Sequence, residues 1–99
     1  MTYKVEEIDN KRIIHLDGEI DMDVTDKARN TILPLIEAGH EVQINLSKVD
    51  YMDSSGISVL IESHQKATEV GTKVILKDIS KSVLKVIMMA KLEQILNLG

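Results

Sequence analysis

Strand-like and helix-like segments alternate along this chain, and that alternation constrains the fold more than any other feature. Residues 41–46 place an apolar side chain at every second position, which predicts a strand with one buried face. Residues 24–36 and 57–67 repeat their apolar side chains every three or four positions, which predicts amphipathic helices. The sequence therefore predicts a single α/β domain over residues 1–99, with a mixed β-sheet of four to five strands and three or more α-helices packed against it.

The first part of the chain predicts a hairpin. Residues 3–8 and 11–16 are two strand candidates, and Asp9-Asn10 between them is a turn signal. Gly18 is expected to end the second strand, because glycine in a strand interior weakens it. The remaining strand candidates are residues 73–77 and, as a short last strand or a further helical turn, residues 95–98.

Three helices are expected, and residues at their ends set their boundaries. Asp23 is the expected N-cap of the first helix, and Pro34 is expected to kink that helix or to end its first part. Ala38-Gly39 and Gly71 are expected to end the first and second helices, and Ser80 to cap the third. The third helix is expected to bury Val83, Leu84, Ile87 and Met88 and to expose Met89.

Composition excludes several classes of function. The chain has 99 residues, a formal net charge of −4 and no run of basic residues, so no nucleic-acid partner is expected. It has no cysteine, which excludes disulfides and zinc-thiolate sites, and its three histidines lack the spacing of a metal site. No segment reaches the roughly 20 apolar residues of a membrane helix, and the N-terminus does not read as a signal peptide. We therefore expect a cytoplasmic protein with no direct membrane insertion.

The chemically informative segment is Asp53-Ser54-Ser55-Gly56. Residues 47–53 are expected to connect the strand at residues 41–46 to a helix that begins at Ser54. A serine at a helix N-cap faces free backbone N–H groups and the positive end of the helix dipole, which together favour an anion such as phosphate. Ser54 is the expected N-cap and the expected phosphorylation site, with Ser55 as the second choice, and Gly56 allows close backbone approach.

Plainer interpretations of these residues stay open. Ser54 can be a helix cap and nothing more, and Asp21 and Asp53 can be loop residues that accept backbone hydrogen bonds. A serine hydrolase is disfavoured, because the nucleophile-elbow pattern Gly-x-Ser-x-Gly is absent. No catalytic residue is therefore assigned.

Taken together, several segments resemble one family. Tyr51-Met52-Asp53-Ser54-Ser55-Gly56-Ile57, placed after the strand Val42–Leu46, resembles the signature of STAS domains. The segments Gly18-Glu19-Ile20-Asp21 and Gly71-Thr72-Lys73-Val74 are similar to two further conserved segments of that family. The resemblance covers nearly the whole chain and is strongest to the small stand-alone bacterial anti-sigma-factor antagonists.

The resemblance implies a concrete function. In that family, the hydroxyl residue directly after the motif Asp is phosphorylated by a GHKL-type serine kinase that doubles as an anti-sigma factor. The matching residue here is Ser54, with Asp53, Ser55, Gly56 and the earlier acid Asp21 as the expected switch surface. The unphosphorylated form would bind and sequester the kinase, and a PP2C-type phosphatase would restore that form. The chain itself would be no enzyme and need no cofactor, since ATP and divalent metal belong to its partners, and we expect a monomer when it is free.

The sequence also departs from the family pattern. The family usually reads Gly-Leu-Gly after the serines, where this chain has Gly56-Ile57-Ser58, and we expect little functional change. The family's late Gly-Leu pair is replaced around Met89–Leu92, which bears on the identity of the partner. Two alternatives stay open: an antagonist that controls secretion, biofilm or second-messenger output instead of a sigma factor, and a non-switching STAS subunit of an ABC transporter or larger signalling complex.

Overall fold

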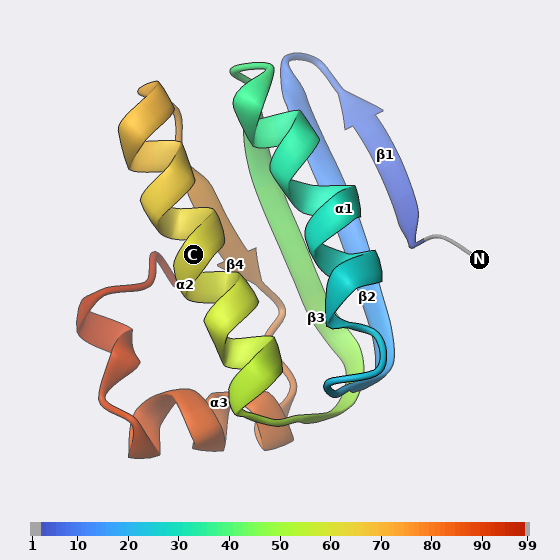
Figure 1. The fold of residues 1–99 in the computed structure, drawn as a ribbon, viewed down its shortest axis with the longest axis vertical. Coiled ribbons are helices and arrows are strands. Elements are labelled where there is room, and N and C mark those ends of the chain that lie inside the picture. Colours follow the sequence, from blue (N-terminus) through green and yellow to red (C-terminus); the bar gives the residue numbers. More distant parts are fainter. Residues whose placement is uncertain (1–2, 99) are drawn as a thin grey trace.

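In the computed structural model, which describes residues 3–98, a four-stranded mixed sheet forms the centre of the molecule (Figure 1). The spatial order of the strands equals their order along the chain. The strands are β1 (Lys4–Ile8), β2 (Lys11–Ile20), β3 (Glu41–Met52) and β4 (Val74–Lys77). β1 and β2 form the expected antiparallel hairpin, while β2, β3 and β4 run parallel to one another.

The helices are α1 (Thr25–Glu37), α2 (Ser54–Val70) and α3 (Lys81–Met89), followed by a short 3₁₀ helix, η1 (Leu92–Gln94). α1 and α2 lie side by side across one face of the sheet (Figure 1). Alternate strand residues such as Ile14 and Ile44 point under these helices, and α1 and α2 contribute Ile32 and Leu60 to the same core. These four side chains are at most 1% exposed, so apolar burial ties both helices to the sheet. The predicted fold class is confirmed.

Strands β2 and β3 are longer than the sequence analysis predicts. Gly18 does not end β2: it has a φ of 71°, lies next to a register shift, and the strand continues to Ile20. The predicted connection at residues 47–53 is also wrong, because β3 continues to Met52. Val49 and Met52 are only 2% exposed, so their burial and the pairing with β2 stabilise this irregular extension.

The predicted N-cap of α1 is wrong. The helix begins at Thr25, after Val24, which makes no side-chain cap hydrogen bond. Asp23 instead lies in the preceding turn, where its N–H donates to Oδ1 of Asp21 at 3.0 Å. A carboxylate that accepts the N–H two residues ahead forms a local turn, which competes with helix capping by Asp23.

Pro34 does not end α1. The helix continues to Glu37, and the carbonyl of Pro34 accepts the N–H of Ala38 at 3.1 Å. The missing N–H of proline therefore removes one hydrogen bond near the end of the helix, while its carbonyl still takes part in the last turn. Ala38 and Gly39, with a φ of 89°, end the helix as expected.

The end of the chain differs from the prediction in two places. Ser80 caps α3 as expected and Val83 and Ile87 are fully buried, but Leu84 and Met88 are 38% and 50% exposed, so their predicted inward orientation is wrong. The physical reason is that α3 packs on the rest of the protein through the side that carries Val83 and Ile87, its two buried residues. Met89 is exposed as predicted. Residues 95–98 form no strand of their own, and Leu98 makes a single parallel bridge to Leu76.

Candidate functional site

Two neighbouring parallel strands bring the motif acids Asp21 and Asp53 to the same edge of the sheet. The last residues of β2 and β3, Ile20 and Met52, are paired across the strands. The N–H of Asp53 donates to the carbonyl of Ile20 at 3.4 Å, which extends this pairing by one step. Because neighbouring strands lie about 4.8 Å apart, the residues that follow these two strands share one small region of surface.

Asp53 caps α2, and the prediction that Ser54 is the N-cap is wrong. Oδ1 of Asp53 accepts the N–H of Ser55 at 2.9 Å and that of Gly56 at 3.2 Å, and its backbone carbonyl accepts the N–H of Ile57. Aspartate caps helices as well as serine does, and here it comes one residue earlier. The carboxylate therefore takes two of the backbone donors that the sequence analysis assigned to a phosphate.

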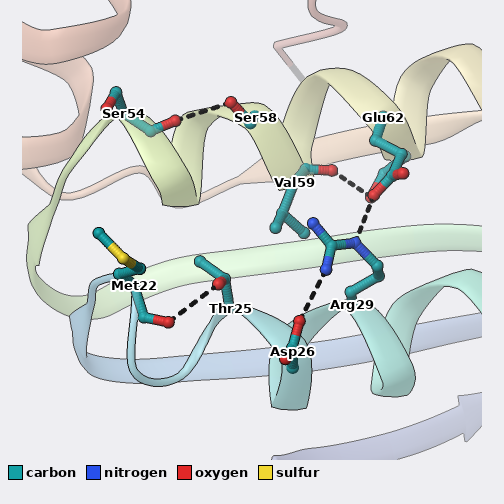
Figure 2. A network of polar contacts seen from close by, with 9 residues as sticks. Met22, Thr25, Asp26, Arg29, Ser54, Ser58, Val59 and Glu62 are labelled. Carbon is teal, nitrogen blue, oxygen red and sulfur yellow. Dashed lines mark hydrogen bonds and ion pairs between the residues drawn. The ribbon is translucent and has the colours of Figure 1, made fainter.

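Ser54 is consequently the first residue of α2 and lies exposed on its outer surface. Within residues 3–98, its hydroxyl takes part in no hydrogen bond, while its carbonyl accepts the hydroxyl of Ser58 at 2.9 Å (Figure 2). Ser55 is half-buried and its N–H is bonded to Asp53. Of the two motif serines, Ser54 is thus the more exposed.

Gly56 lets the start of α2 approach the end of β2 closely. A Cβ atom at this position would lie 2.5 Å from Cγ of Met52 and 2.8 Å from the carbonyl oxygen of Ile20. Both distances are far below ordinary contact, and the carbonyl belongs to a paired strand that cannot move freely. The absence of a side chain at Gly56 therefore allows the first turn of α2 to pack directly against the ends of β2 and β3.

Asp21 has a clear structural role in that loop. Its side chain accepts the N–H of Asp23 and its carbonyl accepts the N–H of Val24 at 3.1 Å. The loop ends where the hydroxyl of Thr25 donates to the carbonyl of Met22 at 3.3 Å (Figure 2). Met22 is 76% exposed, an apolar side chain at the site that the sequence analysis did not identify.

An ion-pair network that was not predicted from the sequence joins α1 to α2. Arg29 of α1 donates to Glu62 of α2 at 2.6 Å and to Asp26 at 2.9 Å (Figure 2). The hydrogen bond and the charge of Glu62 raise the pKa of Arg29 above its ordinary value. Arg29 and Glu62 are 33 residues apart, and no local pattern in the sequence marks them as partners.

The motif acids Asp21 and Asp53 have no paired cation in the described part of the chain, because none of the ion pairs within residues 3–98 includes either of them. Burial, followed by the charges of Asp17 and Asp21, raises the pKa of Tyr3, whose ring lies under the ammonium group of Lys27 at 4.2 Å.

Within residues 3–98, no group of three or more His, Cys, Asp or Glu side chains is arranged to hold a metal ion. In the same residues, no helix is long and apolar enough to cross a membrane.

Comparison with known proteins identifies the class to which this fold and site belong. The family model of the STAS domain matches residues 2–99. The chain therefore belongs to the STAS domain family, which confirms the resemblance drawn from the motif and its flanking glycines.

Among characterised relatives, the anti-sigma-B factor antagonist of Bacillus subtilis (strain 168) is 27% identical over 95 residues, which cover 96% of this chain and 87% of the relative. The fold is similar to that of the anti-sigma factor antagonist SpoIIAA in its unphosphorylated form, with a TM-score of 0.81, 24% identity, and coverage of 99% and 88% of the two chains. The phosphorylated form of SpoIIAA, described as a Bacillus cell fate determinant, gives a TM-score of 0.76, 23% identity, and coverage of 99% and 91%.

Proposed function

We propose that this chain is a protein-binding switch controlled by phosphorylation of Ser54. In its unphosphorylated form it binds and sequesters a GHKL-type serine kinase that doubles as an anti-sigma factor. Phosphorylation of Ser54 by that kinase releases the complex, and a PP2C-type phosphatase reverses the modification. The chain acts in the cytoplasm as a substrate of these enzymes, and ATP and divalent metal bind to the partners.

The observation that carries this proposal is the exposed hydroxyl of Ser54 beside the capping carboxylate of Asp53. A kinase needs an accessible hydroxyl, and because Asp53 does the capping, the hydroxyl of Ser54 makes no hydrogen bond within residues 3–98. The names of the relatives support the same function, since the B. subtilis protein is an anti-sigma-B factor antagonist and SpoIIAA is described in phosphorylated and unphosphorylated forms.

Electrostatics explain how one phosphate would switch binding. A phosphate on Ser54 adds about −1.5 to −2 charges to a surface where, within residues 3–98, Asp53 and Asp21 form no ion pair. At about 6 Å and an effective dielectric constant of about 20, two like charges repel by about 3 kcal/mol. Because Asp53 occupies the Ser55 and Gly56 N–H groups, the phosphate would stay at the surface, where a partner must desolvate it. Each 1.4 kcal/mol lost is about tenfold in affinity, so release needs no refolding.

Binding to a GHKL-type serine kinase of the same organism tests the proposal. We expect Ser54→Ala to bind the kinase in the presence of ATP as tightly as the unmodified protein does, and the phosphorylated protein to bind at least about a hundredfold more weakly. Ser54→Asp should bind at an intermediate level, because aspartate carries one charge where phosphate carries nearly two. Isothermal titration calorimetry measures all three, with Ser55→Ala as the matched control that still responds to ATP. Equal affinity of the phosphorylated and unmodified proteins would contradict the proposal.

A further inference from the structure

The outward face of α3 carries apolar and basic side chains that do not contribute to the core. Leu84 and Met88 lie one helical turn apart and are 38% and 50% exposed, and Met89 is 75% exposed. Lys81 and Lys85 are also exposed and one turn apart, and on the helix surface they lie between the pair Leu84 and Met88 on one side and Met89 on the other. We call these five side chains the α3 face.

The charge of the α3 face is opposite to that of the whole chain. The chain has a formal net charge of −4, yet the stretch from Ile79 to Leu92 contains three lysines and no acidic residue. Among the ion pairs formed within residues 3–98, none includes Lys81, Lys85 or the third lysine, Lys91. The α3 face therefore combines unpaired positive charge with exposed apolar surface.

From this combination we infer that the α3 face is a docking site for an acidic amphipathic helix of a partner protein. Such a helix presents apolar side chains three or four residues apart, which is the spacing of Leu84 and Met88. Its Glu and Asp side chains would flank that apolar stripe and pair with Lys81 and Lys85. Methionine side chains are flexible and adapt to a partner surface, and two of the three apolar residues of the α3 face are methionines.

A membrane is a poorer occupant of the α3 face than a helix is. The apolar stripe consists only of Leu84 and Met88, and Lys81 and Lys85 separate it from Met89, so little continuous apolar surface is available for insertion into lipid. Three lysines fall short of the clusters of about four to eight basic residues that bind anionic membranes, and the remainder of the chain is acidic.

The α3 face is separate in sequence from the motif but lies at the same end of the molecule. α3 and the beginning of α2 are both at the lower end of the view in Figure 1. Ser80, at the start of α3, is anchored to β3, since its N–H donates to the carbonyl of Leu46 and its hydroxyl to that of Val49. The α3 face includes no residue of the motif, so docking can be tested on unmodified protein.

The test uses the isotope-labelled full chain and a synthetic helical peptide of about 15 residues that carries leucines on one stripe and glutamates beside it. We expect saturable NMR shift changes at the amides of α3. A peptide with lysine in place of every glutamate should bind at least about tenfold more weakly, as should the Lys81→Glu/Lys85→Glu and Leu84→Gln/Met88→Gln variants. All four positions are exposed, so these variants should keep the native spectrum elsewhere.

The control is Lys4→Glu/Lys48→Glu, which reverses two exposed lysines outside α3. Peptide binding that this control weakens as much as Lys81→Glu/Lys85→Glu does would overturn the proposal, because the attraction would then be a property of the whole surface. So would shift changes that map away from α3, or equal affinity for the two peptides. The proposal of a helical partner would also be wrong if vesicles with about one third anionic lipid bound to α3 and the acidic peptide did not. Self-association that Lys81→Glu/Lys85→Glu abolishes, measured by sedimentation, would assign the α3 face to a second copy of this chain instead.

Discussion

The starts of α2 and α3 each present a serine near the first turn of a helix, and the structure uses the two serines differently. At α3, Ser80 is the N-cap: its oxygen accepts the N–H of Val83 at 3.4 Å, and its hydroxyl donates to the carbonyl of Val49 at 2.8 Å. At α2, Asp53 is the N-cap, and Ser54 follows it as an exposed helical residue.

This difference shows that capping a helix and being available for modification are competing uses of a serine. The hydroxyl of Ser80 is half-buried and committed to two backbone groups, so it contributes to stability. The hydroxyl of Ser54 is free of such contacts because the preceding carboxylate does the capping. In the proposed switch, the Asp-Ser pair at the start of α2 would assign the structural role to Asp53 and the regulatory role to Ser54.

The largest effect is expected at Gly56, which holds the start of α2 against β2. Gly56→Ala places a methyl group 2.5 Å from the side chain of Met52 and 2.8 Å from a strand carbonyl, so we expect a loss of about 3 kcal/mol in the free energy of unfolding. Chemical denaturation measures the change. The matched control is Gly71→Ala, where no atom lies within 4 Å and only the φ of 92° is unfavourable, with an expected cost of about 1 kcal/mol. Equal costs at the two glycines would mean that close packing at Gly56 is unimportant.

Ser80→Ala should cost about 1 to 2 kcal/mol, because it removes the N-cap of α3 and leaves the carbonyl of Val49 without its hydroxyl donor. Ser54→Ala should change stability by less than about 0.5 kcal/mol, since the side chain is exposed and makes no hydrogen bond within residues 3–98. Thermal unfolding of the two variants sharpens the comparison directly. A destabilisation by Ser54→Ala as large as that of Ser80→Ala would show that Ser54 is a structural residue after all.

Two substitutions at Asp53 distinguish the effect of its helix cap from the effect of its negative charge. Asp53→Ala should cost about 1 kcal/mol by releasing the N–H groups of Ser55 and Gly56, whereas Asp53→Asn should keep the cap at a cost below about 0.5 kcal/mol. Asn removes the negative charge beside Ser54, so the phosphorylated Asp53→Asn protein should bind the kinase more tightly than phosphorylated wild type does. Denaturation and calorimetry on the same two variants check both effects. A phosphorylated Asp53→Asn protein that binds no better than wild type would remove Asp53 from the electrostatic account.

Local patterns in the sequence predicted the elements of the fold well. The alternation at residues 41–46, the hairpin turn at Asp9-Asn10 and the cap at Ser80 are all decided by short-range chemistry, and the structure confirms them. The continuations of β2 beyond Gly18 and of β3 beyond residue 46 were missed, because each extension depends on pairing with the other strand.

The candidate site was predicted in location but not in geometry. The motif predicted a helix opening at Ser54, while the choice between Asp53 and Ser54 as the cap depends on a shift of one residue that propensities do not resolve. The Arg29–Glu62 pair and the exposure of Leu84 and Met88 depend on how whole helices are oriented. Such contacts between distant segments leave no periodic signal in a single sequence.

The most direct test of the central claim is to locate the phosphate. The unmodified protein, Ser54→Ala and Ser55→Ala are each incubated with ATP and the proposed partner, a GHKL-type kinase of the same organism, and the peptide that contains Asp53 is fragmented in a mass spectrometer. The account predicts one phosphate on Ser54 in the wild type, the same in Ser55→Ala, and none in Ser54→Ala. A phosphate on Ser55 with Ser54 unmodified would contradict it.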